Sequence, residues 1–438
     1  MPGAPLEAPT LNESSPPVET PPTKPPVETP PVEKASTITT LSSSVNPSTL
    51  GQAVTYTASV LPRTATGTVA FQDAGTPITS CTTQTVSSAS ATCAVTGYAA
   101  AGSHTITGTY SGDESYLTST SATLTQTVET PAPFRFFAPT SFWNEPVPAD
   151  APLDPSSTAV VAALSEEEEA EQSAKKGPAI NTTSWSVPIY TVPSDQPTVR
   201  VALVNSVSAA LQAAWSAVPL PSDAEPAAGT DKHLVVWQPS TDRMWEFWRL
   251  EKIGEGWQAS WGGAMQDVTA NPGVYGPEAW QGATTSWGAS ASSLPVAGGL
   301  ITLEDLERGE INHALALAVP DTRAGAYASP AKRTDGGSTE PSSLPEGAHL
   351  RLEPSLDLAA LHLPRFTLML AEAAQRYGIF IRDTASNLAF YGEDPIPTGT
   401  NPYTGAHGYY EGKSPPELLA SFPWSHLELL KMQLHATS

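Results

Sequence analysis

The sequence contains little cysteine and little positive charge. Its 438 residues include two cysteines, and 21 Lys and Arg stand against 44 Asp and Glu, which gives a formal net charge of −23. Such an acidic chain repels phosphate backbones and anionic membranes, so we expect no nucleic-acid partner. Cys and His residues at metal-ligand spacing are absent, and we predict no metal site and no cofactor.

Long apolar runs are also missing. The best run, at residues 314–319, is far shorter than the roughly 18 residues of a membrane span, so we predict no transmembrane segment. The first residues, Met1-Pro2-Gly3-Ala4-Pro5, lack the charged start and apolar centre of a signal peptide. Because the rest of the chain has an extracellular character, we expect a truncated or misassigned start and a location outside the cell or at its surface.

Familiar catalytic motifs are absent as well. The chain has no Gly-x-Ser-x-Gly elbow, no His-Glu-x-x-His helix, no phosphate-binding glycine loop and no dinucleotide fingerprint. An esterase or peptidase is therefore the least favoured class of enzyme, although Ser, His and Asp residues distant in sequence can still meet in space.

Composition divides the chain into three regions. Residues 1–35 are rich in proline and repeat Pro-Pro-Val-Glu-Thr-Pro-Pro at 16–22 and 25–31. Such a segment favours an extended spacer that cannot bury a core. Residues 36–129 have almost no charge and are rich in Ser, Thr, Val and Gly, whereas residues 130–438 carry all eleven tryptophans. We predict a linker or stalk followed by two folded domains.

The second region has the alternation of a β-sandwich. Strands are expected at 37–41, 53–60, 67–72, 103–110 and 122–128, with a hairpin around Cys81 and Cys93. On adjacent strands these cysteines are placed to form one disulfide, and two unlinked thiols are the alternative. The segments TTLSSSVNPSTLGQAVTYTASV, GTVAFQDAGTPI and AGSHTITGTYSGDESYLTSTSATLTQTV resemble the bacterial Ig-like repeat family. That resemblance implies an extracellular spacer or display unit without an active site.

The third region is expected to be one large β-rich domain, sandwich-like or jelly-roll-like, with a few helices. We expect helices at 156–176, 302–309, 364–377 and 416–432. We expect strands at 185–192, 199–205 and 311–319, a meander over 233–237, 244–251 and 257–265, and a hairpin over 379–391. The segments HLVVWQPSTDRMWEFW and INHALALAVP resemble uncharacterised secreted actinobacterial proteins, which implies export but no particular chemistry.

Tryptophans gather in residues 231–287. Indole rings stack on the apolar faces of sugars, so we take Trp248, Trp261 and Trp287 as candidate substrate-binding residues. A tryptophan-rich core is the alternative. Glu246 lies among these aromatics on a strand with two apolar faces, where burial would raise its proton affinity, as a general acid requires.

Two further candidates complete the predicted catalytic set. Asp267 is a possible second carboxylate opposite Glu246 for glycoside hydrolysis. His313 falls on an apolar strand face and is a possible general base for lyase chemistry, with Arg323 neutralising a uronate. The alternatives are an ion pair of Glu246 with Arg243 or Arg249 and a core position for His313.

These observations favour a modular extracellular protein whose C-terminal domain binds a polysaccharide or cell-surface glycan, with cleavage of that glycan as a further hypothesis. The enzyme classes that fit are a glycoside hydrolase and a polysaccharide lyase. The second hypothesis is a non-catalytic adhesion or structural protein that uses the same aromatics as core and binding surface.

Overall fold

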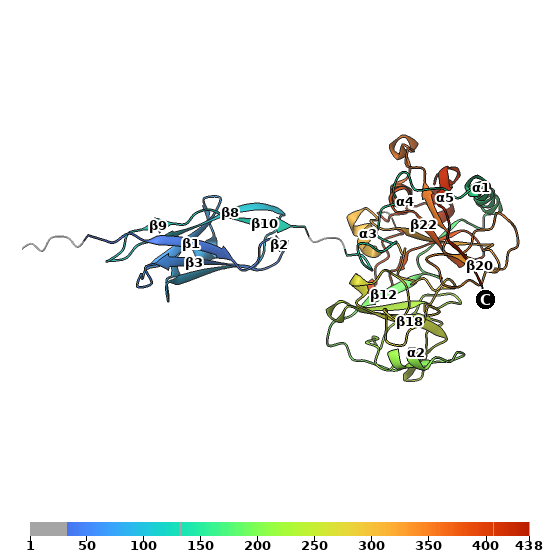
Figure 1. Cartoon of the computed structure of the whole chain (residues 1–438), viewed down its shortest axis with the longest axis horizontal. Helices are drawn as coiled ribbons and strands as arrows, with labels where there is room; N and C mark the ends of the chain where they lie inside the picture. The colour runs from blue at the N-terminus through green and yellow to red at the C-terminus, as the bar shows by residue number, and fades with distance from the viewer. Residues whose placement is uncertain (1–32, 131–133, 406, 438) are drawn as a thin grey trace, which may run out of the picture. The chain divides into compact units, whose positions relative to one another are not determined.

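The computed structural model describes residues 33–130, 134–405 and 407–437, so the predicted proline-rich stalk lies almost wholly outside the described residues. The chain separates into two compact units, with the boundary between residues 133 and 134. Figure 1 shows both units, which are described one at a time below.

The N-terminal unit is a β-sandwich. One sheet has the order β1-β3-β7 and the other the order β2-β10-β8-β4-β5, with β6 on β4 and β9 on β8. The elements are β1 (Ile38–Ser43), β2 (Ser48–Thr49), β3 (Val54–Leu61), β4 (Thr68–Asp73), β5 (Thr76–Pro77), η1 (Thr79–Cys81), β6 (Gln84–Thr85), β7 (Ser90–Val95), β8 (Gly102–Tyr110), β9 (Ser119–Thr120) and β10 (Leu124–Glu129). The five strands predicted from alternation and turn residues are confirmed.

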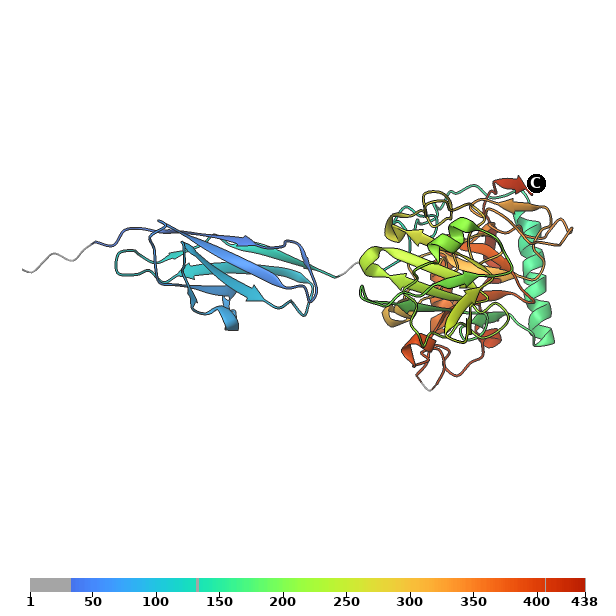
Figure 2. The same cartoon turned by 90° about the horizontal axis from the view of Figure 1, so that it is seen from below.

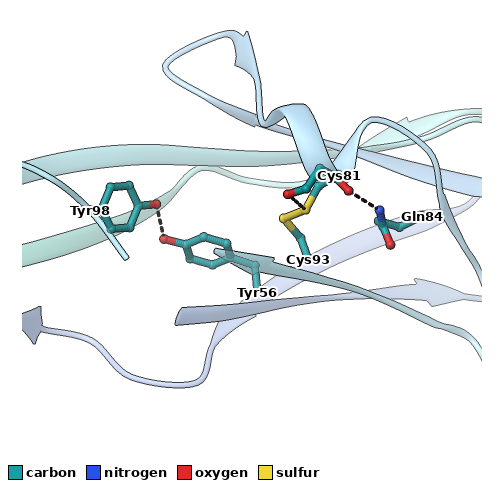
Figure 3. The surroundings of a disulfide bond; sticks show 6 residues. Tyr56, Cys81, Gln84, Cys93 and Tyr98 are labelled. Atoms are coloured by element: carbon teal, nitrogen blue, oxygen red, sulfur yellow. Dashed lines mark hydrogen bonds between the residues drawn. A yellow bond between two sulfur atoms is a disulfide. The ribbon is translucent and has the colours of Figure 1, made fainter. Parts of the chain in front are cut away.

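Alternation places the core of this sandwich between its sheets. In β3, Val54, Tyr56, Ala58 and Val60 are buried while the residues between them are more exposed. The predicted disulfide is confirmed, but Cys81 belongs to the short helix η1 rather than to a strand, and it bonds to Cys93 of β7. Figure 3 shows this disulfide beside the hydrogen-bonded hydroxyls of Tyr56 and Tyr98, whose oxygens are 2.6 Å apart.

The C-terminal unit is also β-rich, as predicted, and contains two main sheets. The six-stranded sheet has the order β11 (Ala179–Asn181), β23 (Ala389–Tyr391), β19 (Leu315–Val319), β22 (Ile379–Thr384), β21 (His349–Leu352) and β25 (Leu427–Leu429). The five-stranded sheet has the order β18 (Trp261–Gln266), β15 (Arg243–Trp248), β14 (Leu234–Gln238), β12 (Val187–Thr191) and β24 (Glu393–Asp394).

Smaller elements surround these sheets. A three-stranded sheet contains β13 (Val201–Leu203), β17 (Gly256–Ala259) and β16 (Glu251–Ile253), and a two-stranded sheet contains β20 (Ala326–Ala328) and β26 (Leu434–Ala436). The α-helices are α1 (Ser157–Ala174), α2 (Ala209–Ala214), α3 (Leu303–Arg308), α4 (Arg365–Arg376) and α5 (Pro415–Leu419). Short 3-10 turns are η2 (Pro239–Thr241), η3 (Val268–Ala270), η4 (Leu358–Leu361), η5 (Ile396–Thr398) and η6 (Trp424–His426).

The central strand β19 shows how the layers are built. Its Leu315, Leu317 and Val319 enter a core shared with α1, α4 and α5, whereas Ala316 and Ala318 enter the core shared with the five-stranded sheet. Figure 1 accordingly shows these three helices beside β22, on the side away from β12 and β18. In Figure 2 the green strands of the five-stranded sheet lie in front of the orange strands. The unit therefore has a helical layer, a mixed sheet and a second sheet.

Small residues allow close packing in the core between the six-stranded and the five-stranded sheet. A Cβ added to Gly299, whose φ is +69°, would lie 2.5 Å from the backbone nitrogen of Ala316 and 2.7 Å from the ring of Trp143. Glycine is the residue that tolerates both this conformation and this approach.

Several predicted elements are confirmed and others are wrong. Helices α1, α3 and α4 form where predicted, and α3 begins with the capping box of Thr302 and Asp305. The predicted terminal helix stops at Leu419, because proline at 423 interrupts the pattern and the chain continues into η6 and β25. The predicted strand at 311–319 begins only at Leu315.

The predicted hairpin and meander also need correction. Strands β22 and β23 do not pair with each other, because the apolar strand β19 lies between them and pairs with both. The meander of β14, β15 and β18 forms, but residues 257–265 divide into β17 and β18, which belong to different sheets.

Candidate functional site

A cleft of about 530 Å³ lies in the C-terminal unit between the ends of its two main sheets. Its lining includes Trp248 and Trp261 from the five-stranded sheet, and Asp231 and His233 from the residues just before β14. The opposite wall contains Asp383 and Thr384 at the end of β22, and residues 333–335 of the segment between β20 and β21. Residues 289–291 also line it.

Strand register explains why Trp248 and Trp261 lie close to Asp231 and His233. The antiparallel register pairs Leu234 with Phe247 and Trp248 with Trp261, so the start of β14, the end of β15 and the start of β18 coincide. Directly opposed residues in antiparallel strands point to the same face, with Cβ atoms about 5 Å apart. The two indoles are therefore neighbours on one face.

Hydrogen bonds fix both indole rings. The Trp248 Nε1–H donates to Asp231 Oδ1 at 3.1 Å, and the Trp261 Nε1–H donates to the Ser286 carbonyl at 3.0 Å. The Arg249 guanidinium lies over the Trp248 ring, 4.3 Å from its centroid. Half-buried rings with bonded N–H groups form a preorganised apolar surface at the cleft.

His233 is the buried histidine of the cleft. Its Nε2 lies 3.2 Å from the Ala289 carbonyl oxygen, while its Nδ1 has no partner among the described residues. Because a carbonyl can only accept, Nε2 carries the proton and Nδ1 keeps its lone pair. Burial lowers the pKa of His233 to about 4, against the opposing effect of Asp231, so the imidazole is neutral at pH 7.

Arg333 joins two segments of the wall. Its Nη2 donates to the carbonyls of Gly288 and Ser290, at 3.2 and 2.7 Å. Burial lowers its pKa, and the nearby carboxylates of Glu346, Asp383 and Asp335 oppose that effect. The guanidinium therefore holds the loop around residue 289 against the segment that carries Asp335.

Three carboxylates approach one another at this wall. Asp335, Glu346 and Asp383 each offer an oxygen, and these oxygens lie within 4.8 Å of one another. Asp335 is exposed, Asp383 is half-buried and Glu346 is fully buried. Burial raises the pKa of Glu346 to about 8, with a further increase from Asp383, and burial raises the pKa of Asp383 to about 7 despite the adjacent Arg382.

Two of the predicted substrate-binding residues line the cleft and two do not. Trp248 and Trp261 are in its wall. Trp287 is completely buried in the core of the five-stranded sheet. Arg323 donates to the carbonyls of Ser343 and Pro341, both at 3.0 Å, and is outside the cleft lining.

The predicted catalytic residues are placed apart from one another. Glu246 has no solvent exposure, and its two oxygens accept from the backbone N–H groups of Ala289 and Val296, at 2.7 and 2.9 Å. Burial raises its pKa to about 7, and these two hydrogen bonds oppose the rise. Since Ala289 lines the cleft, Glu246 supports the wall from behind. Asp267 lies on the surface at the start of η3 and has no contact with Glu246 among the described residues.

His313 occupies a different region, before the first residue of β19. Its Nε2 lies 3.0 Å from Asp305 Oδ2, and its Nδ1 lies 2.9 Å from the Ala314 carbonyl. Burial alone would lower the pKa of His313, but Asp305 outweighs it and the pKa is raised. His313 therefore connects α3 to the start of β19, and both of its ring nitrogens are used in these contacts.

Sequence reasoning missed most of the cleft. Asp231 and His233 belong to the tryptophan-rich segment. Their position just before an apolar strand is the local pattern that could have indicated a site at the end of the sheet. Asp383 similarly follows the apolar residues of β22. Asp335 and Glu346 lie in a long segment without periodicity, and no local pattern indicated them.

Among the described residues, no helix is long and apolar enough to cross a membrane.

Comparison with curated proteins and with solved structures found no match. Residues 41–129, within the disulfide-bonded sandwich, match the family model described as bacterial Ig-like domain (group 3), which identifies the N-terminal unit as an Ig-like domain of this kind.

Proposed function

We propose that the C-terminal unit binds a polysaccharide in the cleft and cleaves it there, in a protein that acts outside the cell or at its surface. The observation that carries this proposal is the meeting of two anchored indoles with His233 and several carboxylates in one cleft of about 530 Å³. A cavity of this size accommodates a ligand of a few sugar rings.

Binding is attributed to the indole pair. Sugar rings present apolar C–H faces, and flat indoles cover them at little entropic cost because their orientation is already fixed. The carboxylates of Asp231, Asp335 and Asp383 line the same cleft and accept hydrogen bonds from sugar hydroxyls. Apolar stacking with polar groups around it is the usual composition of a ligand site.

Cleavage is attributed to His233 as general base. Its neutral ring keeps a lone pair on Nδ1, which has no partner among the described residues but is itself buried. Catalysis therefore requires a side-chain movement on ligand binding that brings Nδ1 to a water molecule or to the ring carbon next to a uronate carboxylate, from which it takes a proton. The first reaction is hydrolysis and the second is elimination. This assignment replaces Glu246 and His313, whose nitrogens and oxygens are already occupied by structural partners.

The test is a panel of neutral and uronate-containing polysaccharides incubated with the full-length chain. Release of reducing ends indicates either reaction, and absorbance of unsaturated uronates indicates elimination. We expect Trp261→Ala to weaken glycan binding about fivefold, since an aromatic contact is worth about 1 kcal/mol. Trp185→Ala is the matched control, because Trp185 is 47% exposed and outside the cleft lining.

His233→Ala should lower product formation at least about 100-fold while leaving glycan binding intact. Retained binding with no product from the wild-type chain would favour the adhesion hypothesis instead. Absence of both binding and product across the panel would contradict the polysaccharide proposal for the glycans tested.

A further inference from the structure

The carboxylate cluster in the cleft wall is assembled from three separate places. Asp335 and Glu346 come from two positions in one segment between β20 and β21, and Asp383 comes from β22. Their nearest oxygens are at most 4.8 Å apart. Three acidic side chains at this spacing repel one another unless positive charge lies between them.

Glu346 supplies an independent observation. It is completely buried, and neither of its carboxylate oxygens has a hydrogen-bond partner among the described residues. Its backbone is well held, since its carbonyl accepts from the Ala328 N–H at 2.8 Å. Without a cation the buried Glu346 carboxyl group is held largely protonated at neutral pH, because burial raises its pKa to about 8. Its oxygens still lack partners, which is unfavourable for a buried polar group, and a bound cation would satisfy them and favour the ionised form.

The neighbouring arginines do not fill this role. Arg333 Nη2 is used by two backbone carbonyls. Arg382 Nη1 donates to the carbonyls of Val296 and Gly298, and its guanidinium lies 3.8 Å from the centroid of the Tyr391 ring. Neither arginine forms an ion pair with the cluster in the described part of the chain.

The spacing fits a hard cation of the size of Ca²⁺. Calcium binds carboxylate oxygens at about 2.3–2.6 Å, so three oxygens spread evenly around one ion are about 4 Å apart. Oxygens within 4.8 Å of one another reach that arrangement with small side-chain adjustments, and the flexible coordination of Ca²⁺ tolerates such a site better than the strict octahedron of Mg²⁺. Carboxylates alone, without His or Cys, are the donor set of Ca²⁺ rather than of Zn²⁺.

We propose that Asp335, Glu346 and Asp383 bind one Ca²⁺ ion in the wall of the cleft. The ion links two positions of the segment between β20 and β21 to β22, and it places a positive charge beside the surface assigned to the glycan. The remaining coordination positions are left for water or for oxygens of a bound ligand. This site goes beyond the proposed function and does not depend on it.

The test is calorimetric titration of the chelator-treated, full-length chain with Ca²⁺ in the absence of glycan. We expect one site per chain, with a dissociation constant on the order of 10⁻⁴ M or lower, and a Ca²⁺-dependent rise in the melting temperature of the C-terminal unit. Asp335→Asn should weaken binding at least about tenfold, and Glu346→Gln should abolish it. Mg²⁺ titrated separately should bind more weakly.

Folding controls keep the result interpretable. Asp335 is exposed, so its amide variant should fold normally. Glu346→Gln replaces an unpartnered buried carboxyl group by a neutral amide of the same size, so it should be about as stable as wild type in chelator. Glu307→Gln is the matched control because Glu307 is exposed on α3 and away from the cleft.

Several outcomes would overturn the proposal. They are the absence of heat and of thermal stabilisation with Ca²⁺, binding that persists in both cluster variants, and binding lost equally in Glu307→Gln, as expected if general acidity attracts the ion. Equal or tighter binding of Mg²⁺ would overturn the choice of Ca²⁺. Because no glycan is present, a negative result here leaves the polysaccharide proposal to its own test.

Discussion

Removing the disulfide of the Ig-like unit should destabilise that unit by a predictable amount. Cys81 and Cys93 are 12 positions apart, and closing a loop of about 13 residues stabilises the folded state by about 3 kcal/mol in the chain-entropy treatment. Both cysteines are buried, with exposures of 2% and 1%, so a Cys81→Ala/Cys93→Ala variant also loses some packing. A change of about 3 kcal/mol in a domain of roughly 100 residues lowers the melting temperature by about 12 °C or more.

The distribution of tryptophan gives this experiment an internal control. All eleven tryptophans lie in residues 130–438, so intrinsic tryptophan fluorescence reports on the C-terminal unit alone. Calorimetry of the full-length chain reports on both units. We expect the transition of the Ig-like unit to move down in the variant while the fluorescence transition stays within about 1 °C of wild type.

Two results would refute this reasoning. A shift of less than about 4 °C in the Ig-like transition, equivalent to less than about 1 kcal/mol, would mean that the bond constrains the unfolded chain very little. A parallel shift of the fluorescence transition would mean that the two units do not unfold independently.

Three other predictions concern the stability of the C-terminal unit, measured by urea unfolding with tryptophan fluorescence. Burial raises the pKa of Glu246 to about 7 from 4.5, so the native state binds this proton more tightly than the unfolded state. This one group should lower stability by about 3 kcal/mol as pH rises from 4.5 to 7, in addition to the effects of Glu346 and Asp383, whose pKa values are also raised. Glu246→Gln should reduce the total fall by about that amount, and an unchanged pH profile would contradict the assignment. Thr302→Ala removes the capping box of α3 and should cost about 1 kcal/mol; no loss would show that the cap is redundant. Gly299→Ala forces a Cβ against the backbone of β19 and should cost at least about 1–3 kcal/mol, whereas Gly276→Ala, which meets nothing within 4 Å, is its control.

The elements that local chemistry determines could be predicted from the sequence. The strands of the Ig-like unit follow from alternation and turn residues, and α4 follows from an apolar stripe that ends at Gly378. The helix predicted for 416–432 is wrong beyond Leu419, because the proline at 423 cannot continue a helix. The hairpin after α4 was wrong because a distant strand, β19, pairs between its two arms, and such insertion leaves no local signal.

The candidate site was less predictable because it depends on contacts between distant residues. Glu246 attracted attention as a carboxylate among large hydrophobic residues, yet the N–H groups that satisfy it belong to residues 43 and 50 positions later. The three carboxylates of the cluster are separated by up to 48 positions, between 335 and 383. They meet only because β21 pairs with β22, and sequence periodicity contains no information on that pairing.

The division of the cleft between two sheets bears on how this protein can diversify. The indoles are carried by the strand ends of the five-stranded sheet, while the carboxylate cluster is carried by β22 and the segment before β21. Arg333 joins the two walls, since its Nη2 donates to the carbonyls of Gly288 and Ser290. In directed evolution the exposed side chains of either wall can be varied, while Arg333 and the close-packed alanines of β19, which lie between the two sheets, are the positions to leave constant.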